Sequence, residues 1–245
     1  MTIRVIVNGA KGRMGAESVK AVEAAEALTL VAACDMGDDL AGAIQDHNAQ
    51  VVVDFTHPDC AYANARIIVE SGAHPVIGTT GFKPEEVDTL TAMCAERELG
   101  GLLAPNFAIG AVLMMRFAAE ASKHLPHVEI IELHHDAKAE APSGTAIKTA
   151  QGIQAARGAA PAAKVKETEL APGARGTKDA YGVPIHSVRL PGHVAHQEVV
   201  LGGLGESLRI RHDSINRESF MPGVVLAARK VVELKTLVYG LEHLL

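Results

Sequence analysis

Short apolar runs alternate with longer amphipathic segments over the first hundred residues of the chain. Residues 3–7 form an apolar run broken only by Arg4, which is typical of a buried parallel strand. The same pattern predicts strands at residues 28–34, 51–55, 75–77 and 101–104, and helices at residues 16–27, 60–71 and 83–98. Because strand, helix and strand follow each other in this way, we expect a parallel sheet with right-handed crossovers.

The pattern changes after residue 107. Helices are predicted at residues 108–123 and 143–157, with a strand at residues 128–134 between them. A long loop rich in Gly, Pro, Ala and Lys is predicted over residues 158–182. Strands at residues 185–189, 196–201 and 207–212 then follow without intervening helices, which favours an open antiparallel or mixed sheet. An amphipathic helix at residues 220–233 is expected to return to the first domain.

The charge balance excludes some classes of partner. The 245 residues carry a formal net charge of −6, so no overall basic field is available for nucleic acid or for an anionic membrane surface. No apolar stretch reaches the roughly 20 residues of a membrane helix, and the N-terminus has no cleavable signal pattern. Cys34, Cys60 and Cys94 form no CxxC pair and are expected to be buried free thiols. We therefore expect a cytoplasmic protein with no metal, no nucleic acid and no membrane partner.

A glycine-rich turn follows the first predicted strand. Residues 9–15 read Gly-x-x-Gly-x-x-Gly and run directly into a predicted helix. Glycine lets the backbone turn tightly and approach a pyrophosphate, and the helix that follows presents unpaired N–H groups to the phosphates. The residues expected to contact a dinucleotide here are Gly9, Ala10, Lys11, Gly12, Arg13 and Met14. A purely structural turn is the alternative.

Asp35 ends the second predicted strand, 20 residues after Gly15. A carboxylate at this place can accept hydrogen bonds from the ribose hydroxyls of the cofactor, although a solvated strand-end carboxylate is the alternative. Met36 follows where an arginine would help to hold a 2′-phosphate, but Lys11 and Arg13 can supply that charge. We therefore expect the cofactor to be NADH or NADPH, with NADH favoured.

Two further turns also follow predicted strands. Ligands of open α/β sheets bind beyond the carboxyl ends of the strands, so these turns are expected to line the nicotinamide half of the site, although each can also be an ordinary turn. Their candidate residues are Gly78, Thr79, Thr80, Ala104, Pro105, Asn106 and Phe107. The predicted fold is thus α/β, with a Rossmann-like parallel-sheet dinucleotide-binding domain at residues 1–106 and 216–245. Residues 107–215 are expected to form a second, α+β domain with an open mixed or antiparallel sheet, for substrate binding and oligomerisation.

The stretch from residue 132 to residue 146 carries the candidate chemistry. His134, His135 and Lys138 leave a predicted strand and lead to Pro-Ser-Gly-Thr, where the serine is a natural N-cap. The N–H groups of Gly144 and Thr145 at the helix start suit a carboxylate ligand, and an imidazole titrates in the range that a proton donor needs. A strand-end polar patch and a simple helix cap are the alternatives. A metal site is disfavoured because adjacent histidines on an extended chain point to opposite faces.

These motifs, in this order, resemble those of the dihydrodipicolinate reductase family. The similar segments are Gly-x-x-Gly-Arg-Met-Gly at 9–15, Gly-Thr-Thr-Gly at 78–81, Pro-Asn-Phe at 105–107 and His-His-x-x-Lys-x-x-x-Pro-Ser-Gly-Thr-Ala at 134–146. Residues 193–199 and 217–220 also resemble that family, so the likeness covers nearly the whole chain. The family usually has Asp where this chain has Glu140, which puts the bracing of this loop in question.

The resemblance implies reduction of 4-hydroxy-tetrahydrodipicolinate to tetrahydrodipicolinate with NADH or NADPH, in lysine and diaminopimelate biosynthesis, by a homotetramer. By matched position, His134 is the general acid/base and Lys138 a second proton donor, while His135, Gly144 and Thr145 bind the carboxylates of a small cyclic substrate. Arg217 is a weaker candidate, for which a surface salt bridge is the alternative. The rival functions are another two-domain dehydrogenase of the aspartate or homoserine type and a non-catalytic NAD(H) sensor.

Overall fold

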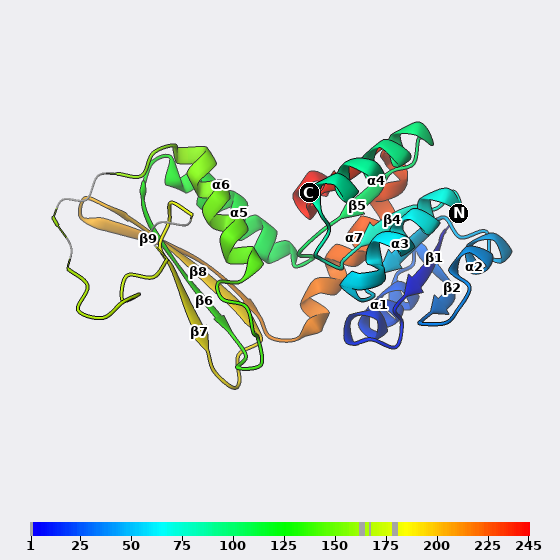
Figure 1. The fold of residues 1–245 in the computed structure, drawn as a ribbon, viewed down its shortest axis with the longest axis horizontal. Coiled ribbons are helices and arrows are strands. Elements are labelled where there is room, and N and C mark those ends of the chain that lie inside the picture. The colour runs from blue at the N-terminus through cyan, green and yellow to red at the C-terminus, as the bar shows by residue number, and fades with distance from the viewer. Residues whose placement is uncertain (1, 162–164, 167, 178–180) are drawn as a thin grey trace. The chain divides into compact units, whose positions relative to one another are not determined.

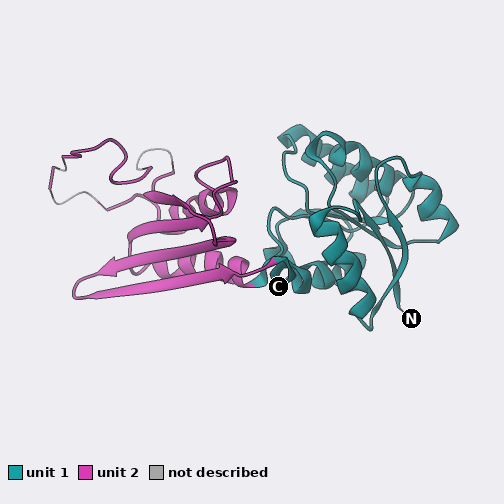
Figure 2. Cartoon of the chain, turned by 90° about the horizontal axis from the view of Figure 1, so that it is seen from below, with its two compact units in different colours: residues 1–109, 217–245 teal, residues 110–216 magenta. Residues whose placement is uncertain are grey.

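The computed structural model describes residues 2–161, 165–166, 168–177 and 181–245. The chain divides into two compact units, which Figure 2 shows in different colours. Unit 1 comprises residues 1–109 and 217–245, and unit 2 comprises residues 110–216.

Unit 1 is built on a parallel sheet with strand order β10-β5-β4-β3-β1-β2 (Figure 1). Its strands are β1 (Ile3–Asn8), β2 (Leu28–Cys34), β3 (Val51–Asp54), β4 (His74–Ile77), β5 (Gly101–Leu103) and β10 (Leu237–Tyr239). Its helices are α1 (Arg13–Ala24), α2 (Leu40–Asp46), α3 (Pro58–Glu70), α4 (Pro84–Glu96) and α7 (Met221–Lys230). Strands β2 and β3 leave β1 in opposite directions, so the switch point of the sheet lies between β1 and β3. This arrangement confirms the predicted Rossmann-like domain.

Helices cover both faces of this sheet. On one face, Ile6, Val52 and Ile77 of the strands share a core with residues of α2, α3 and α4. On the other face, α7 packs against α1 and against β1, β3 and β4. Strand β3 therefore has no exposed side chain, as expected of a central strand covered twice.

Some elements of unit 1 differ from the predicted pattern. Helix α2 and the short strand β10 were not predicted. Asp39 caps α2 by accepting a hydrogen bond from the Gly42 N–H at 3.0 Å. The predicted helix at residues 220–233 is divided into a 3₁₀ turn at Arg217–Phe220, helix α7 and a second 3₁₀ turn at Val231–Glu233. A proline in its first turn favours the start of α7 at Met221, because proline has no N–H and a first-turn position has no acceptor for one within the helix.

Unit 2 is a mixed sheet with strand order β7-β6-β8-β9, as expected. The strands are β6 (His127–His134), β7 (Ile185–Arg189), β8 (Ala195–Gly203) and β9 (Glu206–Ser214). Strand β7 is parallel to β6, whereas β8 is antiparallel to both β6 and β9. Helices α5 (Ile109–Ser122) and α6 (Gly144–Arg157) supply Met114, Ala118, Ala146, Ala150 and Ile153 to the core that covers one face of this sheet.

The long loop at residues 158–182 was predicted to be without helix or strand. Residues 162–164, 167 and 178–180 lie outside the described residues, and the described part of this loop forms turns and bends.

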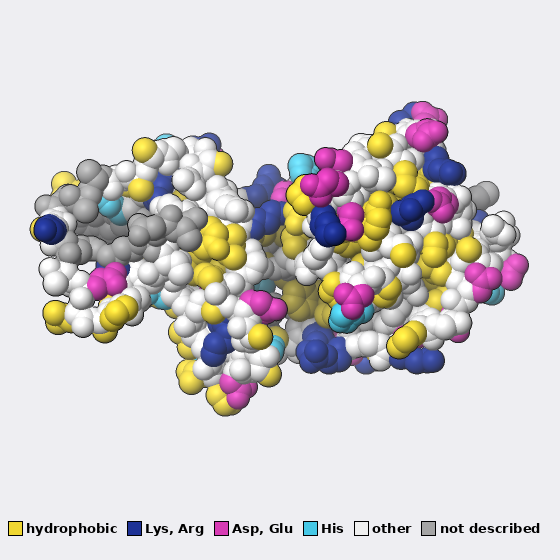
Figure 3. All heavy atoms as spheres, viewed as in Figure 1, with side chains coloured by type: hydrophobic (Ala, Val, Ile, Leu, Met, Phe, Trp, Pro, Cys, Tyr) yellow, Lys and Arg dark blue, Asp and Glu magenta, His cyan; other side chains and the backbone are white. Residues whose placement is uncertain are grey.

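The cysteines required one correction. Cys34 and Cys94 are buried free thiols, as predicted, but Cys60 is exposed. Cys60 lies in the first turn of α3, where its side chain points away from the core and its thiol donates to the His57 carbonyl oxygen at 3.2 Å. Among the described residues, no helix is long and apolar enough to cross a membrane, and no cluster of His, Cys, Asp or Glu forms a metal-ion site. On the face drawn in Figure 3, basic and acidic side chains are interspersed.

Candidate active site

The glycine-rich turn joins β1 to α1 in unit 1. The N–H groups of Gly9 and Ala10 donate to the Cys34 carbonyl oxygen at 2.9 and 3.0 Å, which holds the turn against the end of β2. Gly9 has a φ of +80°, and a Cβ on Gly15 would lie 2.0 Å from the Gly9 carbonyl oxygen. Gly12 is the N-cap of α1 and has no side-chain cap, so the first N–H groups of this helix suit an anionic ligand.

The Asp35 carboxylate is part of the same turn. Its Oδ2 accepts from the Lys11 N–H at 2.7 Å, and its Oδ1 accepts from the Met36 N–H at 2.8 Å. These hydrogen bonds, first the one from Lys11 and then the one from Met36, lower the pKa of Asp35 below its ordinary value. Each oxygen keeps a second lone pair for a hydroxyl donor. The side chains of Lys11, Arg13 and Met36 are exposed beside it.

The two other predicted turns lie at the carboxyl ends of the neighbouring strands. The Thr79 hydroxyl donates to the Thr56 carbonyl oxygen at 2.8 Å, so the turn after β4 is bonded to the turn after β3. The rings of Phe55 and Phe107 meet edge to face with centroids 5.6 Å apart, so the turn after β5 packs against the turn after β3. A Cβ on Gly78 would lie 2.0 Å from the Phe55 ring, so this close packing requires a glycine.

The candidates in these turns differ in exposure. Thr79, Ala104 and Phe107 are buried, whereas Thr80 and Pro105 are exposed. The side-chain oxygen of Asn106 accepts from the Ala108 N–H at 2.8 Å.

Asp54 was missed by the sequence reasoning. It ends β3, has no exposed surface, and accepts from Asn8 Nδ2 at 2.7 Å, Asn64 Nδ2 at 3.2 Å and the hydroxyl and N–H of Thr56 at 2.7 and 3.0 Å. Burial raises the pKa of its carboxyl, although these hydrogen bonds oppose the rise. Through its hydrogen bonds with Thr56 and Asn64, Asp54 thus fixes the turn between β3 and α3. A signal existed, because an Asp follows three valines just as Asp35 follows an apolar run.

In unit 2, Glu132 and His134 lie two residues apart on β6 and therefore on the same face of the sheet. His134 Nδ1 donates to Glu132 Oε2 at 2.5 Å. Arg189, the register partner of His134 on β7, donates from both terminal nitrogens to the two Glu132 oxygens at 2.9 and 2.8 Å. Glu132 has no exposed surface.

The hydrogen bonds to Glu132 decide its ionisation. Burial by itself would raise the pKa of this carboxyl, but the bonds from His134, Arg189 and Ser187 outweigh burial and lower the pKa from 4.5 to about 2. At neutral pH Glu132 is thus a carboxylate that only accepts hydrogen bonds.

The amino-terminal end of α6 is bonded to the same carboxylate, since the Ser143 N–H donates to Glu132 Oε1 at 3.3 Å. The Ser143 hydroxyl accepts from the Ala146 N–H at 3.2 Å, which is the predicted N-cap. Gly144 has no atom within 4 Å of a virtual Cβ, so space is open beside the first helical residue. His134 and the first residues of α6, Gly144 and Thr145 (here called the α6 opening), are thus held next to the same buried carboxylate, that of Glu132.

His135 and Lys138 lie in the turn that follows β6. The Lys138 N–H donates to the His135 carbonyl oxygen at 3.1 Å, and Lys138 Nζ donates to Glu140 Oε2 at 3.2 Å. Glu140 therefore holds the ammonium group of the candidate proton donor. Arg217 is half-buried at the start of its 3₁₀ turn in unit 1.

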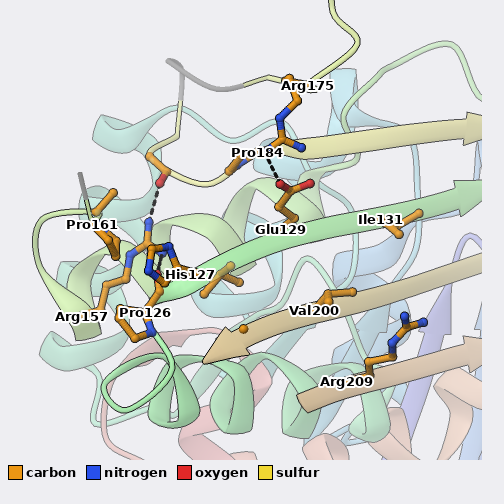
Figure 4. Close-up of a pocket in the computed structure, with 14 residues that line it drawn as sticks. Pro126, His127, Glu129, Ile131, Arg157, Pro161, Arg175, Pro184, Val200 and Arg209 are labelled. Carbon is orange, nitrogen blue, oxygen red and sulfur yellow. Dashed lines mark hydrogen bonds and ion pairs between the residues drawn. The ribbon is translucent and has the colours of Figure 1, made fainter. Parts of the chain in front are cut away.

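Unit 2 also has a cavity of about 780 Å³, and Figure 4 shows the residues that line it. The cavity is lined by His127, Glu129 and Ile131 of β6. Because successive side chains of a strand point to opposite faces, the cavity lies on the face of the sheet opposite to Glu132 and His134. Its arginines are already engaged: Arg175 donates to Glu129, and Arg157 donates to the carbonyl oxygens of Pro126 and Gly182. This cavity is therefore separate from the site around Glu132 and His134, which is called the histidine site below.

Segment 193–199 includes the start of β8. Gln197, the register partner of Glu132, is buried and donates to the Thr149 hydroxyl of α6 at 2.8 Å. His196 Nδ1 and Asp213 Oδ1 lie 2.7 Å apart on neighbouring strands. Gln197, Asp54, Glu132 and Arg189 are the polar residues of these sites that the sequence reasoning did not assign.

A Rossmann-like unit with a glycine turn, together with a second unit that carries a histidine beside the start of a helix, is typical of a two-domain nicotinamide-dependent oxidoreductase. Models of the dihydrodipicolinate reductase N-terminus and C-terminus match residues 3–107 and 110–245. The chain therefore belongs to the dihydrodipicolinate reductase family, which confirms the resemblance noted in its motifs.

Individual relatives support this assignment over their full length. The chain is 52% identical to a 4-hydroxy-tetrahydrodipicolinate reductase of Streptococcus suis and 51% identical to one of Legionella pneumophila, with 100% of each chain covered. It superimposes with a TM-score of 0.91 on a dipicolinate-bound dihydrodipicolinate reductase from Paenisporosarcina, which is 42% identical and covered over 100% of both chains.

Proposed function

We propose that this protein reduces 4-hydroxy-tetrahydrodipicolinate to tetrahydrodipicolinate, with loss of water, at the expense of NADH or NADPH in lysine and diaminopimelate biosynthesis. The observation that carries the proposal is the shared carboxylate, because Glu132 binds both the candidate proton donor His134 and the cap of the α6 opening. An acid/base group and an anion site are thereby held next to each other. The identity of the substrate is inferred from the full-length relatives, which are named 4-hydroxy-tetrahydrodipicolinate reductase.

The α6 opening is the proposed carboxylate site. The N–H groups of Gly144 and Thr145 stand at the positive end of a 14-residue helix, where an anion is stabilised. His135 and Lys138 complete this site from the preceding turn. The dipicolinate bound by the Paenisporosarcina relative is a ring with two carboxylates, which is the ligand chemistry that this site fits.

The proposed proton donors are His134 and Lys138. The bound nicotinamide supplies the hydride. Because His134 Nδ1 is engaged by Glu132, its Nε2 is the nitrogen that is free to face a substrate. In the imidazolium form of the ring, Nε2 gives its proton to the substrate, and the neutral Nδ1–H tautomer remains. Lys138 exchanges the Glu140 carboxylate for a substrate carboxylate and acts as the second donor.

The cofactor site is proposed at the carboxyl edge of the unit 1 sheet. The turn of Gly9, Ala10, Lys11, Gly12, Arg13 and Met14 holds the pyrophosphate, and Asp35 accepts from the ribose. The nicotinamide half is lined by Gly78, Thr79, Thr80, Ala104, Pro105, Asn106 and Phe107. Those of them that are buried contribute packing and backbone groups, since their side chains are engaged within the unit.

Dual use of the cofactors is expected, with NADH favoured. The ionised Asp35 binds ribose hydroxyls and repels a 2′-phosphate, whereas the exposed Lys11 and Arg13 offset part of this repulsion. We expect kcat/KM to be higher for NADH, measured with both cofactors at saturating second substrate. A hundredfold preference for NADPH, equal to about 2.8 kcal/mol, would contradict the assignment of Asp35.

The proposed protein is cytoplasmic and assembles as a homotetramer through the sheet of unit 2. That sheet is covered by α5 and α6 on one face, and its other face carries the ion pairs of Glu129 and Glu198 with arginines.

A coupled absorbance assay tests the function. The full-length protein, supplied with substrate made in place by the preceding synthase, is expected to oxidise NADH or NADPH only when the synthase is active. Aspartate semialdehyde and homoserine with the corresponding cofactor are the controls, and neither is expected to support turnover. Oxidation with one of these controls alone indicates a different dehydrogenase, and binding of NADH without any turnover indicates a sensor.

A further inference from the structure

Glu132 is the most enclosed ionised group in the described part of the histidine site. Its side chain has no exposed surface and receives hydrogen bonds from three separate segments of the chain. The donors are His134 Nδ1 on the same strand, both terminal nitrogens of Arg189 and the Ser187 side chain on β7, and the Ser143 N–H at the cap of α6. A buried carboxylate is stable only when it is compensated in this way.

These contacts fix the whole loop between β6 and α6. His134, the last residue of β6, precedes the loop and Ser143, the N-cap of α6, ends it, and both donate directly to Glu132. The middle of the loop is reached through Arg189, whose NH2 group also donates to the Glu140 carbonyl oxygen at 2.6 Å. One carboxylate therefore sets the positions of the proposed proton donor, of the segment that holds Lys138, and of the carboxylate-binding helix opening.

The same contacts select one form of the His134 ring. Because the Glu132 carboxylate can only accept hydrogen bonds, the neutral imidazole must carry its proton on Nδ1 and present Nε2 as the exchanging nitrogen. Partners that orient a histidine in this way act through the ring rather than on the substrate.

We propose that Glu132 is the positioning residue of this active site, with Arg189 as its counter-charge. It holds the Nδ1–H tautomer of His134 and the opening of α6 in one arrangement, so that proton transfer and carboxylate binding occur on the same substrate. This inference rests on the proposed role of His134.

The test variant is Glu132→Gln, which keeps the size of the side chain. Glu132 Oε2 accepts from His134 and Arg189, and Oε1 accepts from Ser143 and Arg189. An amide nitrogen at either place opposes two donors, so either His134 or the α6 cap loses its acceptor. We expect kcat/KM for the dicarboxylate substrate to fall about 10- to 100-fold. The KM for NADH is expected to stay within about twofold, because the proposed cofactor residues belong to unit 1.

A spectroscopic readout separates positioning from a general loss of stability. In protein labelled with ¹⁵N-histidine, the neutral His134 ring is expected as the Nδ1–H tautomer, with its signals assigned by their loss in His134→Asn. Where the new amide nitrogen takes the place of Oε2 in Glu132→Gln, the Nε2–H tautomer is expected to appear, because an amide nitrogen facing Nδ1 favours an acceptor there. Where it takes the place of Oε1, the Nδ1–H tautomer stays and the fall in kcat/KM comes from the α6 cap. A tautomer unchanged from the parent protein, together with kcat/KM within threefold, overturns the inference.

Glu129→Gln is the matched control. Glu129 lies on the same strand and also accepts from an arginine and a histidine, namely Arg175 and His186, but on the opposite face of the sheet. Its kcat/KM is expected within about twofold of the parent protein when both are compared in the same oligomeric state. An equal loss in both variants assigns the effect to the fold of the sheet and also overturns the inference.

Arg189→Lys keeps the test decisive if Glu132→Gln does not accumulate in folded form. Lysine preserves the charge but not the bond to both oxygens, so Glu132 is less firmly held, and a fall of kcat/KM in the same direction is expected. Full activity of a folded Arg189→Lys protein, with Glu132→Gln unfolded, assigns Glu132 to stability alone. The proposed function fails separately, if His134→Ala itself keeps normal turnover.

Discussion

His134→Ala is expected to lower kcat by about 10²- to 10⁴-fold, the usual contribution of a positioned general acid/base. The substitution removes the nitrogen that is proposed to face the substrate and leaves the buried Glu132 carboxylate without one of its donors. The dissociation constant of NADH is expected to stay within about twofold, because the glycine turn and Asp35 belong to unit 1. The measurements are steady-state kcat at saturating substrate and titration of nucleotide fluorescence.

A control separates this effect from the general loss of an imidazole. His124 lies just after α5 in unit 2 and is exposed, so His124→Ala is expected to keep the kcat of the parent protein. Near-normal turnover of His134→Ala would show that another group donates the proton. Lys138 would then be the first residue to examine, since its ammonium group is paired with the exposed Glu140 and is not buried.

Gly15→Ala is expected to weaken NADH binding by about 10- to 100-fold. A Cβ at this position would lie 2.0 Å from the Gly9 carbonyl oxygen, so either the turn opens or α1 moves away from it. Overpacking of this kind costs about 1–3 kcal/mol, and here the strain falls on the groups proposed to hold the pyrophosphate. Isothermal titration with NADH measures the loss, and a thermal melt measures the accompanying destabilisation.

Gly152→Ala is the matched control for this substitution. Gly152 lies inside α6 with no atom within 4 Å of a virtual Cβ, so alanine fits there. We expect this variant to be more stable by about 0.5–1 kcal/mol, as for a glycine replaced in the middle of a helix. Its affinity for NADH is expected to be unchanged. Unchanged NADH affinity in Gly15→Ala would place the pyrophosphate away from this turn.

The predicted strands agree best where local sequence is distinctive. The strands at residues 28–34 and 185–189 have the predicted bounds, and each contains β-branched residues, which favour extended backbone. Strand β10 escaped prediction because a three-residue strand has no readable periodicity, and it exists through pairing with β5. The packing of α7 is likewise a tertiary feature, since a Cβ on Gly223 would lie 1.9 Å from the Phe107 carbonyl oxygen.

The candidate sites show the same division. His134, Ser143 and the glycine turn stand in short contiguous motifs whose chemistry is readable in one dimension. Arg189 was not assigned because it lies 55 residues beyond His134 and reaches Glu132 only through the pairing of β7 with β6. Asp54 was passed over for a related reason, since its donors Asn8, Thr56 and Asn64 come from three segments.

The sequence by itself determined the alternation of elements that gives the two-part α/β architecture, the glycine-rich turn and the histidine-to-helix segment, because each of these patterns depends on neighbours within a few residues. Only the tertiary structure decided which buried carboxylate joins His134 to the start of α6. The register of β6 with β7 sets Arg189 beside His134, and the docking of α6 on the sheet brings the Ser143 N–H to Glu132. Such contacts depend on the position of a strand relative to its partner, and a single strand carries no record of that position.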